Sequence, residues 1–340
     1  MVGLENEEAS LDYSIVIPVY YNEGMLETTF GALKETVIDR NQNFCGEVIF
    51  VDDGSGDGSL DELLRIRDQF PDLVTIIKLT RNFGQVSAIN AGFRNASGRC
   101  VIAISADGQD PVDLINQMLD EFLRGTEVVI ATREERDESL FRVWTSRFFY
   151  KMMKTMSFPN MPAGGFDFFL LGRRALDTIL RNQEAHPFLQ GQILWTGYPV
   201  KFLPYRRRQR EIGASRWSFG KRLTYLLDGV MSYSFLPIRL MSATGAIVAL
   251  SGFLYALVIL LEKLLWGNPV TGWAPLMIVI LVLSGIQLLM LGVIGEYVWR
   301  TLAQSRQREA YVIDSIYGYD ESRAPRARHL HLPSGEGHDR

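Results

Sequence analysis

The sequence has very little cysteine, the residue that cross-links small folds through disulfides or zinc. It holds only two cysteines, Cys45 and Cys100. Their spacing matches neither a zinc site nor a disulfide framework. A zinc-stapled or disulfide-rich scaffold is therefore excluded, and the scarcity of cysteine is typical of a chain in reducing, cytosolic surroundings.

The sequence also lacks an excess of positive charge. Lysine and arginine number 35 against 39 acidic residues, and the formal net charge is −4. Because nucleic-acid binding requires a basic face, we expect no nucleic acid as a partner. The first residues, MVGLENEE, are acidic and contain no apolar run, so we expect no signal peptide there.

Long apolar runs are confined to one part of the chain. Residues 1–235 have the composition of a soluble protein, whereas much of 240–299 is nearly pure hydrocarbon. The runs 240–261 and 274–297 each exceed the ~20 residues that span a bilayer core. We predict two transmembrane helices joined as a hairpin. Two buried core helices are the alternative, and the length of the runs argues against it.

Basic residues flank this hairpin on its outer sides, whereas its connecting loop offers only Lys263. They are Arg206, Arg207, Arg208, Arg210, Arg216, Lys221, Arg222 and Arg239 before it, and Arg300, Arg306 and Arg308 after it. The positive-inside rule then places both termini and the preceding domain in the cytoplasm.

From residue 13 the chain alternates short β-branched runs with longer amphipathic stretches. We predict strands at 13–19, 47–53, 73–79, 99–105 and 127–132, and helices at 23–39, 60–69, 85–95 and 111–122. Apolar strands separated by helices predict an α/β fold with a mostly parallel, Rossmann-like sheet that is covered on both faces. Such sheets bind ligands beyond the carboxyl ends of their strands.

Polar motifs follow four of these strands, and their convergence predicts a binding site at one edge. They are PVYYNE at 18–23, DDGS at 52–55, TRNFG at 80–84 and SAD at 105–107. Each motif alone has an ordinary alternative. DDGS is also a turn that caps a helix, and Tyr20 could serve only strand-end packing.

Two further segments mix aromatic, methionine and basic residues at helical spacing. This composition is typical of amphipathic helices in the headgroup layer, and packing against the α/β core is the alternative. The resulting division is a flexible N-terminus at 1–12, a domain at 13–235 with amphipathic segments near 144–158 and 217–235, the hairpin at 240–299, and a cytosolic segment at 300–340 with a disordered tail from about 321.

Taken together, the motifs resemble those of inverting family-2 glycosyltransferases of the GT-A fold. The matching stretches are IPVY at 17–20, VDDGSGDGS at 51–59, RNFGQVSAINAG at 81–92, SADGQDP at 105–111 and GFDFFLLGRR at 165–174. Adding GASRW at 213–217, PIR at 237–239 and the two spans narrows the resemblance to bacterial polyprenyl-phosphate glycosyltransferases of the GtrB type, which are relatives of dolichyl-phosphate mannose synthase. The resemblance covers roughly residues 13–319.

The resemblance implies a nucleotide site at the first motifs. It assigns Asp53 to the nucleobase, where a carboxylate accepts from the imide N–H of uracil, and Tyr20 to stacking on the base. The other matching positions are Pro18, Glu23, Arg81, Gly84, Ser105, Ala106 and Asp107. The chain departs from the family at Gln85, where relatives often carry lysine.

The stretch SADGQDP resembles the family's Asp-x-Asp motif with Ser105 in place of the first aspartate. Asp107 matches the usual metal ligand, so the resemblance implies Mg²⁺ or Mn²⁺ shared by Asp107 and the donor diphosphate. Gln109 and Asp110 match positions next to the sugar and metal. Asp110 is equally well explained as the cap of a helix that begins at Pro111.

The resemblance places Asp167 beside the acceptor and makes it, with Asp107, a predicted catalytic residue. A lipid phosphate has a second pKa of about 6 and is already largely ionised. We therefore expect Asp167 to orient acceptor or sugar more than to remove a proton. Candidate ligands of the acceptor phosphate are Arg133, Arg142, Ser146, Arg207, Arg210 and Arg216. For the basic run at 206–210, topology and lipid anchoring alone are the alternative.

The resulting prediction is an inverting, metal-dependent hexosyltransferase of the bacterial inner membrane. It would move glucose from UDP-glucose to undecaprenyl phosphate and supply an envelope glycan such as lipopolysaccharide. Its partners would be the UDP-sugar, the polyprenyl phosphate, the bilayer and further copies of itself, for example in a tetramer. Another sugar, a processive synthase and a non-catalytic sugar-nucleotide sensor are the alternatives. The synthase is disfavoured because no glutamine precedes Arg216 at the required spacing.

Overall fold

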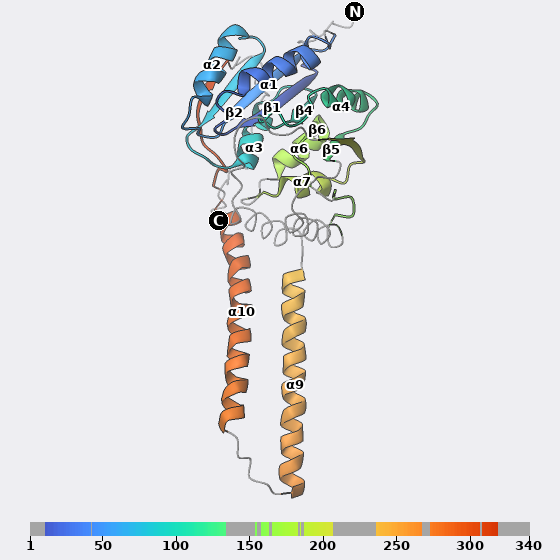
Figure 1. Ribbon diagram of the computed structural model, residues 1–340. Helices are drawn as coiled ribbons and strands as arrows, with labels where there is room; N and C mark the ends of the chain where they lie inside the picture. The colour runs from blue at the N-terminus through green and yellow to red at the C-terminus, as the bar shows by residue number, and fades with distance from the viewer. Residues whose placement is uncertain are drawn as a thin grey trace, which may run out of the picture.

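The computed structural model describes an α/β domain and two long helices that extend away from it (Figure 1). The described residues are 11–41, 43–133, 154, 158–162, 165–182, 184, 187–206, 236–266, 273–306 and 308–318. Of the predicted amphipathic segments, 217–235 and most of 144–158 lie outside them, as does the tail from 321.

One mixed, mostly parallel sheet forms the centre of the domain. Its order is β7-β5-β6-β4-β1-β2-β3-β8. The strands are β1 (Tyr13–Val19), β2 (Gly46–Asp52), β3 (Val74–Leu79), β4 (Cys100–Ala103), β5 (Val128–Arg133), β6 (Phe169–Gly172), β7 (Val200–Tyr205) and β8 (Ile313–Tyr317). Pairs β1–β2, β1–β4, β2–β3 and β5–β7 are parallel, while β6 and β8 run antiparallel to their neighbours.

Helices cover both faces of the sheet, as the alternating pattern predicts. One buried apolar cluster packs α1 (Leu26–Leu33), α2 (Ser59–Gln69) and α4 (Leu114–Leu123) against the sheet. A second cluster packs α3 (Gln85–Asn95), α6 (Arg173–Arg181) and α7 (Leu189–Trp195) on the opposite face. The predicted α/β fold is confirmed. The helix expected at 23–39 begins later and ends in a π-helical turn, η1 (Lys34–Ile38).

The last strand reaches the sheet from beyond the two long helices. β8 pairs with β3, and Lys78 Nζ lies 2.6 Å from Asp314 Oδ2 across the pair. The amide of Thr80 donates to the carbonyl of Val312 at 3.0 Å. Residues 313–317 therefore complete the sheet, although the sequence analysis assigned them to the segment that follows the hairpin.

The two long helices agree with the predicted apolar runs. They are α9 (Leu236–Trp266) and α10 (Trp273–Ser305), of 31 and 33 residues. At 1.5 Å per residue each is about 45–50 Å long, more than a ~30 Å hydrocarbon core requires. In the candidate spans Ile238–Ile259 and Val282–Ser305, no described residue is buried inside the protein. Both are candidate membrane helices by length and composition.

Candidate functional site

The carboxyl ends of β1, β2, β3 and β4 lie at one edge of the sheet, because these four strands run parallel. β6 runs the other way, and its first residue, Phe169, pairs with Ala103 at the end of β4. Asp167 therefore enters the same edge from the opposite chain direction. The structure brings together the described motifs that the sequence analysis placed at this edge.

The first motif is held against the DDGS region by hydrogen bonds. The amide of Tyr21 donates to Ser55 Oγ at 3.0 Å, and the amide of Gly58 donates to Glu23 Oε2 at 3.0 Å. Pro18 lies in β1 opposite Val51. The carboxylate of Glu23 thus holds the start of α2, and Tyr20 lies directly before this tightly held turn.

Asp53 organises the loop that follows β3. Its carboxylate is buried and accepts from the backbone amides of Phe83 at 2.7 Å and Gly84 at 2.9 Å, and from the side-chain amide of Asn82 at 3.0 Å. Arg81 lies over the ring of Phe83, 4.4 Å from its centroid. In this structure the carboxylate assigned to the base shapes the loop that carries Arg81 and Gly84.

The DDGS turn requires glycine at position 54. Gly54 has a φ of +68°, and a Cβ there would lie 2.6 Å from the carbonyl carbon of Arg81. We expect Gly54→Ala to destabilise the protein by about 1–3 kcal/mol and to weaken the UDP binding that the family resemblance implies, because the loop after β3 must move. Thermal unfolding and UDP titration of the full chain measure the two effects.

Gly125→Ala is the matched control for this prediction. Gly125 also has a left-handed φ, +95°, but a Cβ there meets nothing within 4 Å. It carries the backbone strain without the clash and should keep the UDP affinity of the parent chain. Equal UDP affinities for both variants would show that Gly54 has no special role in the site.

The loop after β4 turns sharply at Asp107. The Oδ1 atom of Asp107 accepts from the amide of Gln109 at 3.2 Å, and Gly108 between them has a φ of +62°. Thr29 Oγ1 donates to the carbonyl of the buried Ala106 at 3.2 Å. Helix α4 starts at Leu114 with Asp113 in the N-cap position, which corrects the expected start at Pro111. Asp110 does not occupy the cap position.

The residues at this turn suit a metal ion only in company with a ligand. Among the described residues, no three histidine, cysteine or acidic side chains form a group that could hold a metal. Mg²⁺ commonly takes one or two protein carboxylates and fills its remaining positions with phosphate oxygens and water. Asp107 together with a donor diphosphate would supply that set, whereas Ser105 would add at most a weak neutral ligand.

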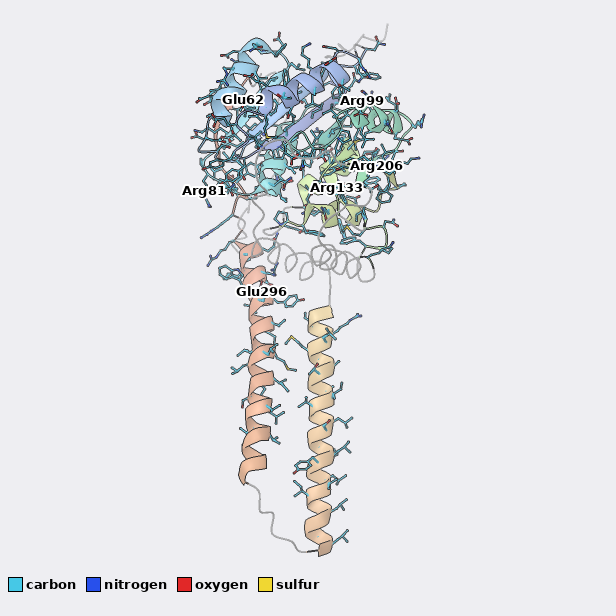
Figure 2. The ribbon with its side chains drawn as sticks, viewed as in Figure 1. Glu62, Arg81, Arg99, Arg133, Arg206 and Glu296 are labelled. Atoms are coloured by element: carbon cyan, nitrogen blue, oxygen red, sulfur yellow. The ribbon has the colours of Figure 1, made fainter. Side chains whose placement is uncertain are left out.

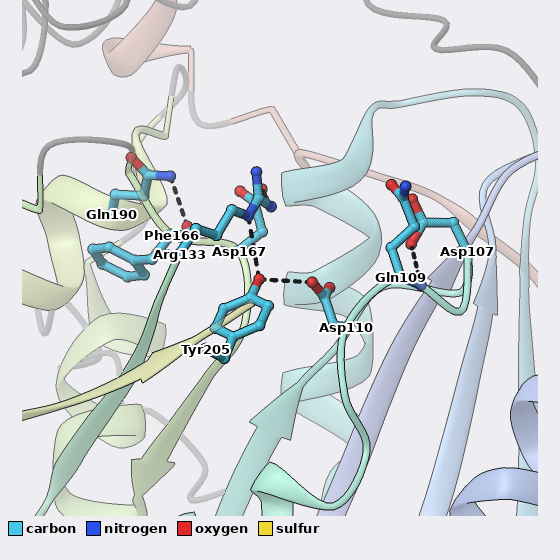
Figure 3. A network of polar contacts seen from close by, with 8 residues as sticks. All are labelled: Asp107, Gln109, Asp110, Arg133, Phe166, Asp167, Gln190 and Tyr205. Atoms are coloured by element: carbon cyan, nitrogen blue, oxygen red, sulfur yellow. Dashed lines mark hydrogen bonds and ion pairs between the residues drawn. The ribbon is translucent and has the colours of Figure 1, made fainter. Parts of the chain in front are cut away.

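A chain of polar contacts lies on the other side of the edge (Figure 3). Arg133 Nη2 lies 2.9 Å from Asp167 Oδ2, and Arg133 Nε donates to the hydroxyl of Tyr205 at 3.2 Å. The Tyr205 hydroxyl donates to Asp110 Oδ1 at 2.7 Å. These contacts join Arg133 and Asp167, which are predicted to lie on the acceptor side, to the loop after β4.

Burial and charge act in opposite directions on this arginine. Burial is the largest influence and lowers the pKa of Arg133, but Asp167, Tyr205 and Asp110 outweigh it and leave the pKa above its ordinary value. Arg133 therefore keeps its charge although only 16% of its side chain is exposed. A half-buried guanidinium that is fixed by these contacts is suited to binding a phosphate.

Two residues of this region could not be predicted from the sequence pattern. Tyr205 was not singled out, although it ends a strand directly before the basic run. Gln190 in α7 donates from Nε2 to the carbonyl of Phe166 at 2.6 Å and so holds the segment that carries Asp167. Nothing in the sequence around Gln190 distinguishes it from any other polar residue of an amphipathic helix, so it could not be predicted as a site residue. Five predicted acceptor residues lie outside the described residues: Arg142, Ser146, Arg207, Arg210 and Arg216.

Comparison with known proteins gives the chain its family. A model described as Glycosyl transferase family 2 matches residues 14–180. The Bacillus subtilis (strain 168) glycosyltransferase YkcC is 36% identical over 321 residues, 94% of this chain and 98% of that protein. The bactoprenol glucosyl transferase of Shigella phage SfV is 32% identical over 303 residues, 88% of this chain and 97% of that protein.

The chain is also similar to a solved structure. The mannosyltransferase PcManGT from Pyrobaculum calidifontis, in complex with GDP-Man and Mn²⁺, has a TM-score of 0.47 and 19% sequence identity, over 65% of this chain and 63% of its own. The curated relatives align over nearly their full lengths, and the matched family range contains the Asp53, Asp107, Arg133 and Asp167 positions. The chain therefore belongs to glycosyltransferase family 2, and it is a glycosyltransferase.

Proposed function

We propose that this enzyme transfers glucose from UDP-glucose to undecaprenyl phosphate at the cytoplasmic face of the bacterial inner membrane. Relatives that align over most of the chain are named bactoprenol glucosyl transferases, which supports a polyprenyl phosphate as acceptor. The product would be a lipid-linked sugar donor for an envelope glycan.

The side of the domain on which the site lies carries this proposal. β8 follows α10 closely, and its first residue, Ile313, pairs with Leu79 at the carboxyl end of β3. Arg81 and Arg133 lie on the side that faces α9 and α10, whereas Glu62 and Arg99 lie toward the far side (Figure 2). A site that faces two candidate membrane helices suits an acceptor whose tail lies in the bilayer.

The chemistry that fits this site is a single displacement at the anomeric carbon. A phosphate oxygen of the acceptor forms the new bond, and the bond to the UDP oxygen breaks on the opposite face of the sugar. An α-linked donor then gives a β-linked product. Since the acceptor phosphate is already largely ionised, no side chain has to remove a proton.

In this reaction one side of the site binds the acceptor and the other binds the donor. Arg133 holds the acceptor phosphate and Asp167 orients it or the sugar. Asp107 would hold Mg²⁺ or Mn²⁺ together with the donor diphosphate. When bound, such an ion neutralises the charge that grows on the leaving group.

The same arrangement supports a cytoplasmic location of the domain. Basic residues lie at the domain ends of both helices, for example Arg239 and Arg300, and the positive-inside rule then puts the domain in the cytoplasm. Glu296 and Arg300 form an ion pair at 2.9 Å in the last turns of α10, near the domain (Figure 2). Charges are costly in hydrocarbon, so this pair, which falls in the last ten residues of the candidate span Val282–Ser305, would lie at the membrane surface.

The proposal is tested with the full chain in lipid nanodiscs and a panel of labelled nucleotide sugars. UDP-glucose with undecaprenyl phosphate and Mg²⁺ or Mn²⁺ is expected to give labelled lipid, and NMR of the product should show the β-anomer. Transfer from UDP-galactose, UDP-N-acetylglucosamine or GDP-mannose instead would show that the enzyme transfers a sugar other than glucose. Nucleotide binding without any lipid product would favour the sensor and contradict the proposal.

A further inference from the structure

Tyr205 lies between the two halves of the site. Its hydroxyl accepts from Arg133 Nε at 3.2 Å and donates to Asp110 Oδ1 at 2.7 Å. Arg133 belongs to the predicted acceptor side, and Asp110 belongs to the loop that carries Asp107. One phenolic oxygen thus joins groups that the proposed reaction must bring into register (Figure 3).

The fold places this hydroxyl with little freedom. Tyr205 and Arg133 are register partners in the parallel pair β5–β7. The Tyr205 ring is 6% exposed and meets the buried ring of Phe168 edge-on, with centroids 6.1 Å apart. Two residues that are paired on neighbouring strands point to the same face of the sheet. The strand pairing and the packed ring therefore fix the position of the Tyr205 hydroxyl next to Arg133.

The hydroxyl keeps its proton, so its two hydrogen bonds have fixed directions. Burial is the main cause that raises the pKa of Tyr205, and the negative charge of Asp110 adds to it. The phenol donates to the carboxylate and accepts from the guanidinium. Hydrogen bonds to charged groups are the stronger kind and hold both partners in place.

The contacts also decide which nitrogen of Arg133 is offered to the acceptor. Nε is committed to Tyr205 and Nη2 to Asp167. Nη1 takes part in neither contact. A guanidinium fixed at two of its three nitrogens presents the third in one orientation, which lowers the entropic cost of binding a phosphate.

We infer that Tyr205 is a positioning residue that aligns Arg133 for the acceptor phosphate and holds the Asp110 end of the donor loop in register with it. The inference rests on the proposed function and adds a residue to it. Tyr205 acts through Arg133 and Asp110 and does not itself touch the reacting atoms.

The test compares Tyr205→Phe with the parent chain in the nanodisc assay. Losing the hydroxyl is expected to raise the KM for undecaprenyl phosphate about 10-fold, the value of one hydrogen bond to a charged group. The Kd for UDP should stay within about twofold, because Asp53 and Arg81 lie at the other end of the site. An unchanged KM for undecaprenyl phosphate would overturn the inference.

A double-mutant cycle separates positioning from a general structural role. Arg133→Lys keeps the positive charge but has no Nε–H to donate to the phenol. Tyr205→Phe should therefore raise the KM much less in the Arg133→Lys background than in the parent chain. Equal fold-changes in both backgrounds would refute coupling through this hydrogen bond, whatever the variants do to the melting temperature.

Tyr13→Phe is the matched control. Tyr13 is also a buried strand tyrosine, but it begins β1 at the opposite edge, and its hydroxyl has no hydrogen-bond partner among the described residues. It should leave the KM for undecaprenyl phosphate unchanged. A parent chain that transfers no sugar to undecaprenyl phosphate would overturn the proposed function and this inference together. An active parent with an unaffected Tyr205→Phe variant would overturn the inference alone.

Discussion

Replacing Asp107 by alanine is expected to lower the rate of sugar transfer about 100- to 1,000-fold, the usual loss when a group that stabilises developing charge is removed. The physical reason is the sparse donor set of the turn, where Ser105 cannot replace the missing carboxylate. Mn²⁺ binding should be weak in the parent chain alone and strong with UDP present. Titration calorimetry with and without UDP should show that the variant loses the UDP-dependent binding.

Asp107→Asn is the control for the shape of the turn. Asp107 Oδ1 accepts from the amide of Gln109 at 3.2 Å, and an asparagine oxygen can accept the same bond. If Asp107 only shaped the turn, the asparagine variant would be active and the alanine variant impaired. We expect both to lose activity and UDP-dependent Mn²⁺ binding. Tight Mn²⁺ binding to the UDP-free parent chain that disappears in Asp107→Ala would contradict the shared site.

The strands of the first half could be predicted because the sheet buries them on both faces. β1 and β2 are buried along almost their whole length, so their apolar runs are continuous. β7 lacks such a run, because it lies at the edge of the sheet and contains the exposed Pro204. An edge strand tolerates proline, since one side of it donates no ladder hydrogen bonds.

The direction and order of the later strands could not be predicted from local pattern. β6 has four residues and inserts antiparallel between β4 and β5, a choice that depends on its neighbours. β8 reaches β3 after two long helices, and its Asp314 pairs with Lys78 across 236 positions. No periodicity within a window of ten or twenty residues carries that information.

The candidate site shows the same division between local and distant information. The position of Asp107 followed from its strand end, because parallel strands bring their carboxyl ends together, whereas Arg133 was assigned only from the family resemblance. The contact of Tyr205 with Asp110, 95 residues earlier, depends on β7 pairing with β5. Asp53 was correctly expected at the edge, but its hydrogen bonds to the loop after β3 could not be read from its motif.

The Asp167 carboxylate should be more important as a hydrogen-bond acceptor than as a base. Asp167→Ala is expected to reduce kcat/KM about 100-fold, because Arg133 loses the partner at 2.9 Å that fixes Nη2. Asp167→Asn can still accept from Nη2 and should stay within about fivefold of the parent chain. Steady-state kinetics with undecaprenyl phosphate and UDP-glucose measure both variants.

The Arg173–Asp177 pair on α6 provides the control for this prediction. Asp177 pairs with Arg173 at 3.2 Å and is 51% exposed, close to the 46% of Asp167, but it belongs to a surface helix. Asp177→Ala and Asp177→Asn should both retain the parent rate, since exposed ion pairs contribute little. An equal collapse of Asp167→Ala and Asp167→Asn, with both Asp177 variants active, would instead identify Asp167 as a general base. The reaction would then need a proton acceptor although its phosphate nucleophile is already ionised.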